Sequence, residues 1–75
     1  MAKESKRYWL TFGPQHVRRP LICEMSRKHD LLFDIRSANV TTEMGLVAIE
    51  LTGEAKVIAA ALTWLRRRGV EVNPI

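Results

Sequence analysis

The chain has 75 residues, 47% of them hydrophobic and 27% charged, which is enough for one two-layer domain with a small core. Twelve Lys and Arg against eight Asp and Glu give a net charge of +4, which attracts anions only weakly. One cysteine excludes an internal disulfide, and two histidines without a second cysteine do not form the ligand spacing of a structural metal site.

Several classes of protein are not expected from this sequence. No stretch approaches the ~20 apolar residues of a membrane helix, and residues 1–7 lack the apolar segment of a secretory signal. Neither a glycine-rich phosphate loop nor a pair of catalytic carboxylates is present. We therefore expect a cytoplasmic, non-enzymatic chain that does not insert into a membrane and holds no metal or cofactor.

Residues 1–6 are polar and are predicted to form a flexible lead-in to a single domain over residues 7–75. Residues 7–12 alternate between apolar and polar side chains, which predicts a half-buried strand. Trp9 lies on the opposite face from the other apolar side chains of this strand. A first helix is predicted from Pro20, because proline suits the first turn of a helix, with Asp30 closing it.

A hairpin is predicted next, because residues 30–40 and 46–51 are two β-rich runs separated by a short polar, glycine-containing tip. In an unbroken strand, Phe33 and Ile35 would face one side while Ala38 and Val40 face the other. A β-bulge between Ile35 and Ala38 resolves this conflict, and an ordinary irregular strand is the alternative. Bulges often change the direction of side chains beside functional sites. The bulge hypothesis therefore makes residues 34–37 the first candidates for a binding role.

A second helix is predicted after a turn at Thr52-Gly53, because apolar residues recur at helical spacing up to Leu65. Glu54 is placed in its first turn and Arg66 to Arg68 in its last, where cations complement the helix dipole; a phosphate-binding run is the alternative interpretation. Gly69 supplies the left-handed position after the helix. Residues 70–73 then alternate as a final edge strand stopped by a proline.

The order of strands and helices predicts an α+β fold, the ferredoxin-like βαββαβ sandwich, in which two helices cover one face of a four-stranded antiparallel sheet. The first and third strands are expected in the centre. Trp9, Leu46 and Ala48 are expected on the face without helices, and a partly apolar, uncovered face usually meets a partner. We therefore expect a homodimer, through the open sheet face or through strand edges.

Some single residues have simpler explanations than a functional one. Trp64 is interpreted as packing between helix and sheet, and Cys23 as a small buried residue, because no base is identified beside it. His16, in a loop, and His29, near a helix end, are not interpreted as ligands. Asp34 differs from these, because an unpaired buried acid is costly and Arg36 is a neighbouring partner. Together they could bind a zwitterion: Asp34 would contact the ammonium group of the ligand, and Arg36 would contact the carboxylate of the ligand.

The order and spacing of several stretches together resemble the NIL domain. These stretches are Pro20-Leu21-Ile22, residues 30–38, residues 45–53, Trp64-Leu65 and Gly69-Val70-Glu71-Val72. The resemblance implies a ferredoxin-like fold related in shape to amino-acid-sensing domains. NIL domains occur at the C-terminus of methionine-importing ABC transporter ATPases. The resemblance therefore implies a domain that dimerises, binds methionine at the dimer interface and inhibits transport. Other members are fused to iron–sulfur modules associated with sulfur amino-acid metabolism.

The Asn-Ile-Leu triplet that names the family reads Asp34-Ile35-Arg36 here. Asn donates and accepts hydrogen bonds, ionised Asp only accepts, and Arg replaces an apolar contact with a cation. The resemblance predicts that a dimeric, regulatory domain binds methionine or a related amino acid in a groove formed with the second subunit. The residues expected to line this groove are Phe33, Asp34, Ile35, Arg36 and Ser37.

An alternative function is a protein-interaction module without a ligand, whose open sheet face docks a transporter or an enzyme of sulfur metabolism. Nucleic-acid binding is a third hypothesis, suggested by the positive charge and by ferredoxin-like sheets that bind RNA. Such sheets stack bases on paired aromatic side chains, whereas Trp9 stands alone on this face. Nucleic acid is therefore not an expected partner.

Overall fold

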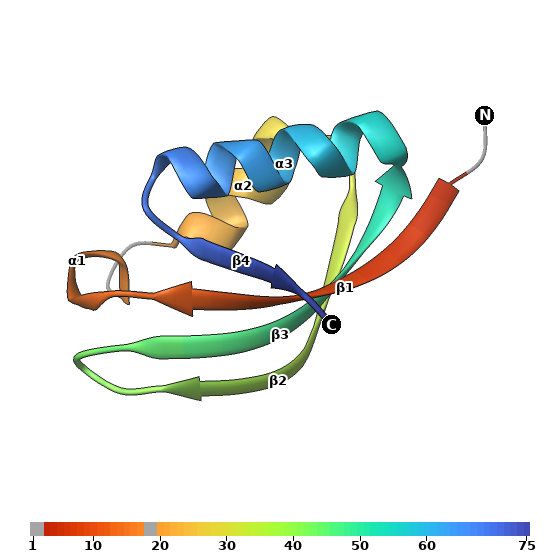
Figure 1. The fold of residues 1–75 in the computed structure, drawn as a ribbon. Coiled ribbons are helices and arrows are strands. Elements are labelled where there is room, and N and C mark those ends of the chain that lie inside the picture. The colour runs from red at the N-terminus through yellow and green to blue at the C-terminus, as the bar shows by residue number, and fades with distance from the viewer. Residues whose placement is uncertain (1–2, 18–19) are drawn as a thin grey trace.

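A computed structural model describes residues 3–17 and 20–75, and it places the two longer helices, α2 (Leu21–Lys28) and α3 (Ala55–Arg67), together on one side of a single curved sheet (Figure 1). In chain order the elements are β1 (Lys3–Phe12), α1 (Pro14–Val17), α2 (Leu21–Lys28), β2 (Leu32–Val40), β3 (Gly45–Glu54), α3 (Ala55–Arg67) and β4 (Glu71–Pro74). The four strands pair antiparallel in the order β2-β3-β1-β4. The predicted α+β ferredoxin-like sandwich with central β1 and β3 is confirmed.

The core lies between the two central strands and the helices. Leu10 of β1, Met25 of α2, Ile49 and Leu51 of β3 and Leu65 of α3 are all 0% exposed. On α3 the buried residues follow the predicted helical spacing: Ile58, Ala61, Leu62 and Leu65. The edge strand β2 contributes no buried residue, because all nine of its residues are exposed. Burial therefore anchors three strands firmly and leaves the fourth at the surface.

The predicted bulge is confirmed in β2. The pairing of β2 with β3 shifts between Ile35, which lies opposite Ile49, and Ser37, which lies opposite Ala48, so that Arg36 is the extra residue. On one side of the bulge Phe33 and Ile35 share the helix-facing side of the sheet, and on the other side Ala38 and Val40 share it. One inserted residue thus keeps the apolar side chains of both halves of β2 on the same face.

Two strands are longer than the sequence indicated. Residues 3–6, predicted as part of a flexible lead-in, continue β1, and Lys3 pairs opposite Glu54. The prediction for residues 1 and 2 falls outside the described residues. The turn predicted at Thr52-Gly53 is wrong, because β3 continues to Glu54 and α3 begins directly at Ala55. Glu54 is therefore the residue before α3 rather than part of its first turn. The added residues of β1 pair with the added residues of β3, so each extension provides hydrogen-bonding partners for the other.

The helices also differ from the prediction at their ends. The helix expected from Pro20 begins at Leu21, with Pro20 as the residue before it, and ends at Lys28 rather than at Asp30. His29 caps it, since both its backbone N–H and its ring Nδ1 approach the Met25 carbonyl, at 3.1 and 2.8 Å. The short α1 was not predicted, and it places His16 in a helical turn instead of a loop.

Gly69 occupies the predicted left-handed position after α3, with φ of 91°. Its N–H donates to the Arg66 carbonyl at 3.0 Å, which closes the end of the helix. A Cβ atom at this position would lie 2.9 Å from Cε1 of His16, so the absence of a side chain lets α1 pack against the turn. No helix among the described residues has the length and apolar character needed to cross a membrane.

Candidate functional site

The five residues predicted to bind a ligand lie on the exposed edge strand β2 and face two sides of the sheet. Phe33 and Ile35 are on the helix-facing side, 40% and 46% exposed, opposite Leu51 and Ile49. Asp34 and Ser37 are on the open side, opposite Glu50 and Ala48. The structure therefore brings these residues together along an edge rather than around a closed pocket.

Asp34 and Arg36 form an ion pair across the bulge, with Nη1 of Arg36 3.0 Å from Oδ2 of Asp34. The Arg36 and Asp34 side chains are 48% and 62% exposed. An exposed pair of this kind contributes only about 0–1 kcal/mol to stability, because water screens both charges. The pair thus presents a hydrogen-bond-accepting carboxylate and a hydrogen-bond-donating guanidinium side by side, both accessible to an external zwitterion.

A row of charges crosses the open face from β2 to β1. Asp34 lies directly opposite Glu50 of β3, and two carboxylates in such a position repel each other. Each carboxylate has its own guanidinium: Arg36 contacts Asp34, and Nε of Arg7 on β1 lies 2.9 Å from Oε1 of Glu50. Alternating charges therefore offset the repulsion and give the open face a polar stripe.

Beside this stripe, the open face is partly apolar, as the alternation of residues predicted. Trp9 lies opposite Ala48 and is 38% exposed, while Leu46 lies opposite Thr11 and is 40% exposed. Ala48 is only 5% exposed, so it adds little surface to this face. The proposal that Trp9, Leu46 and Ala48 form an interface stays a prediction.

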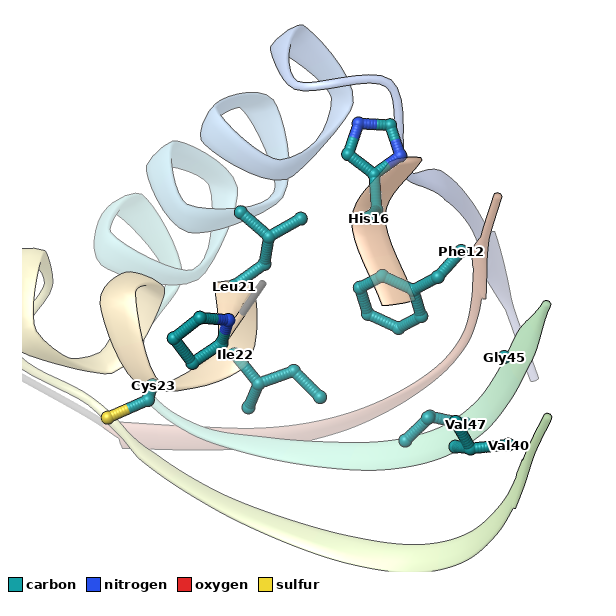
Figure 2. A pocket seen from close by; sticks show the side chains of 9 residues that line it. Phe12, His16, Leu21, Ile22, Cys23, Val40, Gly45 and Val47 are labelled. Atoms are coloured by element: carbon teal, nitrogen blue, oxygen red, sulfur yellow. The ribbon is translucent and has the colours of Figure 1, made fainter. Parts of the chain in front are cut away.

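A cavity of about 160 Å³ lies on the opposite, helix-facing side of the sheet (Figure 2). Its lining comes from α1, from the first turn of α2 with the proline before it, and from the ends of three strands: Phe12, His16, Pro20, Leu21, Ile22, Cys23, Val40, Gly45 and Val47. The pocket is about half open to solvent and its lining is mainly apolar, so an apolar side chain could enter it from outside. It lies apart from residues 33–37.

This pocket was not predicted. The apolar residues of strand and helix have the pattern of filled core, and nothing in their spacing marks where packing is incomplete. Two observations distinguish the cavity from ordinary core. Nδ1 of His16 is buried and has no hydrogen-bond partner among the described residues, and Cys23, predicted to be buried, is exposed. The prediction for Cys23 is wrong because α2 turns Leu21 and Met25, not Cys23, towards the core.

Gly45→Ala is expected to raise the free energy of unfolding by about 0.4–1 kcal/mol, because alanine restricts the unfolded chain at a position with ordinary strand geometry. The added Cβ would lie 3.6 Å from both Cδ2 of Phe12 and Cγ2 of Val40, which is normal contact inside the cavity. Urea denaturation measures the change. Gly53→Ala is the control, because its Cβ would lie 3.1 Å from Cβ of Leu31 and should bring no gain. A less stable Gly45→Ala variant would contradict the cavity's described shape.

Trp64 packs against the edge of the core, as predicted, and also joins the two helices. The Arg68 guanidinium lies 3.9 Å from the centre of its ring, and the His29 ring meets it edge-on at 6.3 Å. Arg68 therefore packs on Trp64 through a cation–π contact, in addition to placing a positive charge at the end of α3. In the described part of the chain, no three His, Cys, Asp or Glu side chains gather as metal ligands would.

Comparison with known proteins agrees with this fold. The family model of the NIL domain matches residues 6–74. Methionine import ATP-binding proteins are similar over 96% of the chain at 33% identity in Myxococcus xanthus and over 88% at 33% identity in Acinetobacter baylyi. The chain spans only 23% and 20% of the length of these two relatives.

A solved structure is similar as well: the C-terminal domain of an ABC transporter ATP-binding protein from Enterococcus faecalis. It is 27% identical, the match covers 93% of this chain and 82% of that one, and the TM-score is 0.80. The family model covers nearly the whole chain, and relatives and structure agree with it. The chain therefore belongs to the NIL domain family.

Proposed function

We propose that this chain is a non-enzymatic, regulatory amino-acid-binding domain that acts as a dimer. Its ligand is methionine or a related amino acid, held in a groove that a second copy completes beside residues 33–37. The observation that carries the proposal is the exposed Asp34–Arg36 pair, at the position where the resemblance places the family's Asn-Ile-Leu triplet. A transporter or an enzyme of sulfur metabolism is the partner on which the domain would act.

Two features support this site. A carboxylate and a guanidinium 3.0 Å apart offer complementary contacts to the ammonium and carboxylate of a free amino acid. Phe33 and Ile35, on either side of Asp34, are exposed apolar side chains that could contact a thioether side chain. The relatives named as methionine import proteins make methionine the first ligand to test.

Isothermal titration with methionine, cysteine and glutamate tests the proposal, with glutamate included because Arg36 favours a more anionic ligand than the apolar residue of the family triplet. We expect saturable heat with at least one of them below about 1 mM, and a matching rise in melting temperature. Arg36→Ala should weaken binding at least tenfold, because it removes a charge-assisted contact worth roughly 1.5–3 kcal/mol.

Arg7→Ala is the matched control. Arg7 is also an exposed arginine on the open side and also pairs with a carboxylate, at 2.9 Å, but it lies on β1 away from the bulge. Binding should survive this change. Absence of heat and of a thermal shift for all three amino acids would remove the sensor proposal, and equal losses in both variants would place the ligand elsewhere.

The alternative function is a protein-interaction module without a ligand of its own. The exposure of Trp9 and Leu46 on the open face favours it, because large apolar side chains on an uncovered sheet commonly mark protein interfaces. In a crystal of the dimer, a groove beside residues 33–37 that is filled by the protein's own side chains would favour this alternative. A groove occupied by an added amino acid would favour the sensor.

A further inference from the structure

The outer side of α3 is exposed and carries charges of one sign only. No other described element covers it (Figure 1). Its exposed residues recur at one-turn spacing, with cations at the two ends and small side chains between them: Lys56, Ala59, Ala60, Thr63, Arg66 and Arg67. Between Ala55 and Arg68 the sequence contains no Asp or Glu. We call the surface made by these exposed residues the α3 outer face.

The cations of the α3 outer face have no acidic partner within the domain. In residues 3–17 and 20–75, no carboxylate oxygen lies within ion-pair distance of any of them. The sheet differs, because Lys6, Arg7 and Arg36 each lie within 3.5 Å of a carboxylate oxygen. Charges on the sheet are therefore balanced locally, whereas those on α3 attract an acidic group from outside the domain.

A groove lies beside the C-terminal end of this face, where α3 meets the residue that follows α2. Six residues line it: His29, Ala60, Thr63, Trp64, Arg67 and Arg68. The Arg68 guanidinium lies flat against a partner already, 3.9 Å from the centre of the Trp64 ring, which fixes its position. Its N–H groups point along the plane of the guanidinium and remain able to donate to a carboxylate. Two guanidiniums therefore line one groove, in the arrangement that arginine uses to bind planar anions.

The small side chains in the middle of the face favour a helix as the partner. Packed helices have axes about 8–10 Å apart, and small residues at the contact allow the closer distances. The cations at positions 56 and 67 are about 16 Å apart along the helix axis, at ~1.5 Å per residue, with no charge between them. A nucleic-acid strand carries a phosphate about every 3.4 Å, so several phosphates would face the uncharged middle. An acidic helix with carboxylates near its two ends matches this spacing.

We propose that the α3 outer face docks an acidic helix of a partner protein, which runs antiparallel to α3. The first turn of a helix favours acidic side chains, so the first turn of the partner helix lies over Arg66 to Arg68 and a later acid lies near Lys56. This inference deepens the proposed function, because it names the surface through which the domain would act on a transporter or an enzyme. It rests on the proposed function for the role of the partner alone, and it uses no residue of the proposed amino-acid site.

A two-dimensional NMR titration tests the docking, because one tryptophan lies at the groove and the other on the open face of the sheet. The probe is an alanine-rich helical peptide of about 18 residues, with glutamates in its first turn and one more about 16 Å further along. The indole N–H signal of Trp64 should shift and saturate below about 1 mM peptide, while that of Trp9 stays in place. Raising the salt concentration from about 0.01 to 0.1 M shortens the Debye length about threefold and should weaken binding about tenfold. A peptide with glutamines in place of the glutamates should not bind.

Two double variants with the same net charge locate the contact. Arg66→Gln/Arg67→Gln removes two neighbouring cations from the α3 outer face and should weaken peptide binding at least tenfold. Lys6→Gln/Arg7→Gln removes two neighbouring cations from β1 and should leave binding within about twofold of wild type, because exposed charges farther away than a Debye length are screened. Circular dichroism confirms that both variants are folded before the titrations are compared.

Four results would overturn the docking proposal. They are an unchanged Trp64 signal, equal shifts of Trp64 and Trp9, equal losses in the two double variants, and tighter binding of a single-stranded oligonucleotide than of the peptide at the same salt concentration. The calorimetric titration with amino acids separates this inference from the proposed function. A domain that binds the acidic peptide but no amino acid ends the sensor proposal alone, whereas a domain that binds an amino acid but not the peptide ends the docking proposal alone.

Discussion

Leu65→Ala is expected to lower the free energy of unfolding by roughly 2–5 kcal/mol, because it leaves a cavity where a leucine side chain was fully buried. Leu65 is 0% exposed in the last turn of α3, and its carbonyl accepts hydrogen bonds from the backbone N–H groups of both Arg68 and Val70 at 3.1 Å. A domain of 75 residues has a total stability of only about 4–11 kcal/mol. The loss is therefore a large fraction of the total stability, and the variant should melt at a much lower temperature than the wild type.

Urea denaturation followed by circular dichroism measures this loss. Thr63→Ala, on the exposed side of the same helix, is the matched control and should change stability by no more than about 0.5 kcal/mol. If Leu65→Ala costs as little as Thr63→Ala, the described core between α3 and the sheet is not the main source of stability. Equal melting curves for the two variants would show this.

Deletion of Arg36 should be tolerated, whereas deletion of Ala48 should prevent folding. Arg36 is the extra residue of β2, so its removal joins Ile35 to Ser37 and leaves every other residue opposite its present partner on β3. Ala48 lies in β3, which pairs with β1 without interruption from Lys3 opposite Glu54 to Phe12 opposite Gly45. Deleting a residue there moves the side chains of one half of a central strand to the opposite face of the sheet.

Thermal unfolding and a two-dimensional NMR spectrum distinguish the two deletions. The protein without Arg36 should show dispersed peaks and a melting temperature within a few degrees of wild type, because it loses only an exposed ion pair worth about 0–1 kcal/mol. It should also lose the binding of amino acids that Arg36 is proposed to provide. A collapsed spectrum for this protein would mean that the bulge is required for the fold itself.

Most of the fold could be predicted because its signals are local. The alternation in residues 7–12, the helical spacing up to Leu65 and the left-handed glycine at position 69 each follow from neighbours in the sequence. The conflict of side-chain faces in β2 even located the bulge, because a two-residue period cannot be satisfied without an inserted residue. Strand ends were less predictable, since residues 3–6 and 52–54 are ordered by pairing with each other rather than by their own composition.

The site was less accessible from the sequence for two physical reasons. Exposure depends on which strands the helices cover, and the apolar residues of β2 have the pattern of a core strand although Phe33, Ile35 and Val40 are 40–57% exposed. Packing defects have no periodic signal, so the cavity beside His16 and Cys23 could not be separated from filled core. The pairing of Asp34 with Arg36 was predictable, because an acid in an otherwise apolar strand favours a neighbouring cation as its partner.

β2 has contacts on both sides of the sheet, because Val40 at its end lines the cavity while Asp34 and Arg36 near its middle lie at the open edge. Among the described residues β2 pairs with β3 alone, so displacing it breaks fewer backbone hydrogen bonds than displacing a central strand. A change in the position of its end would alter the shape of the pocket beside Phe12 and Val47.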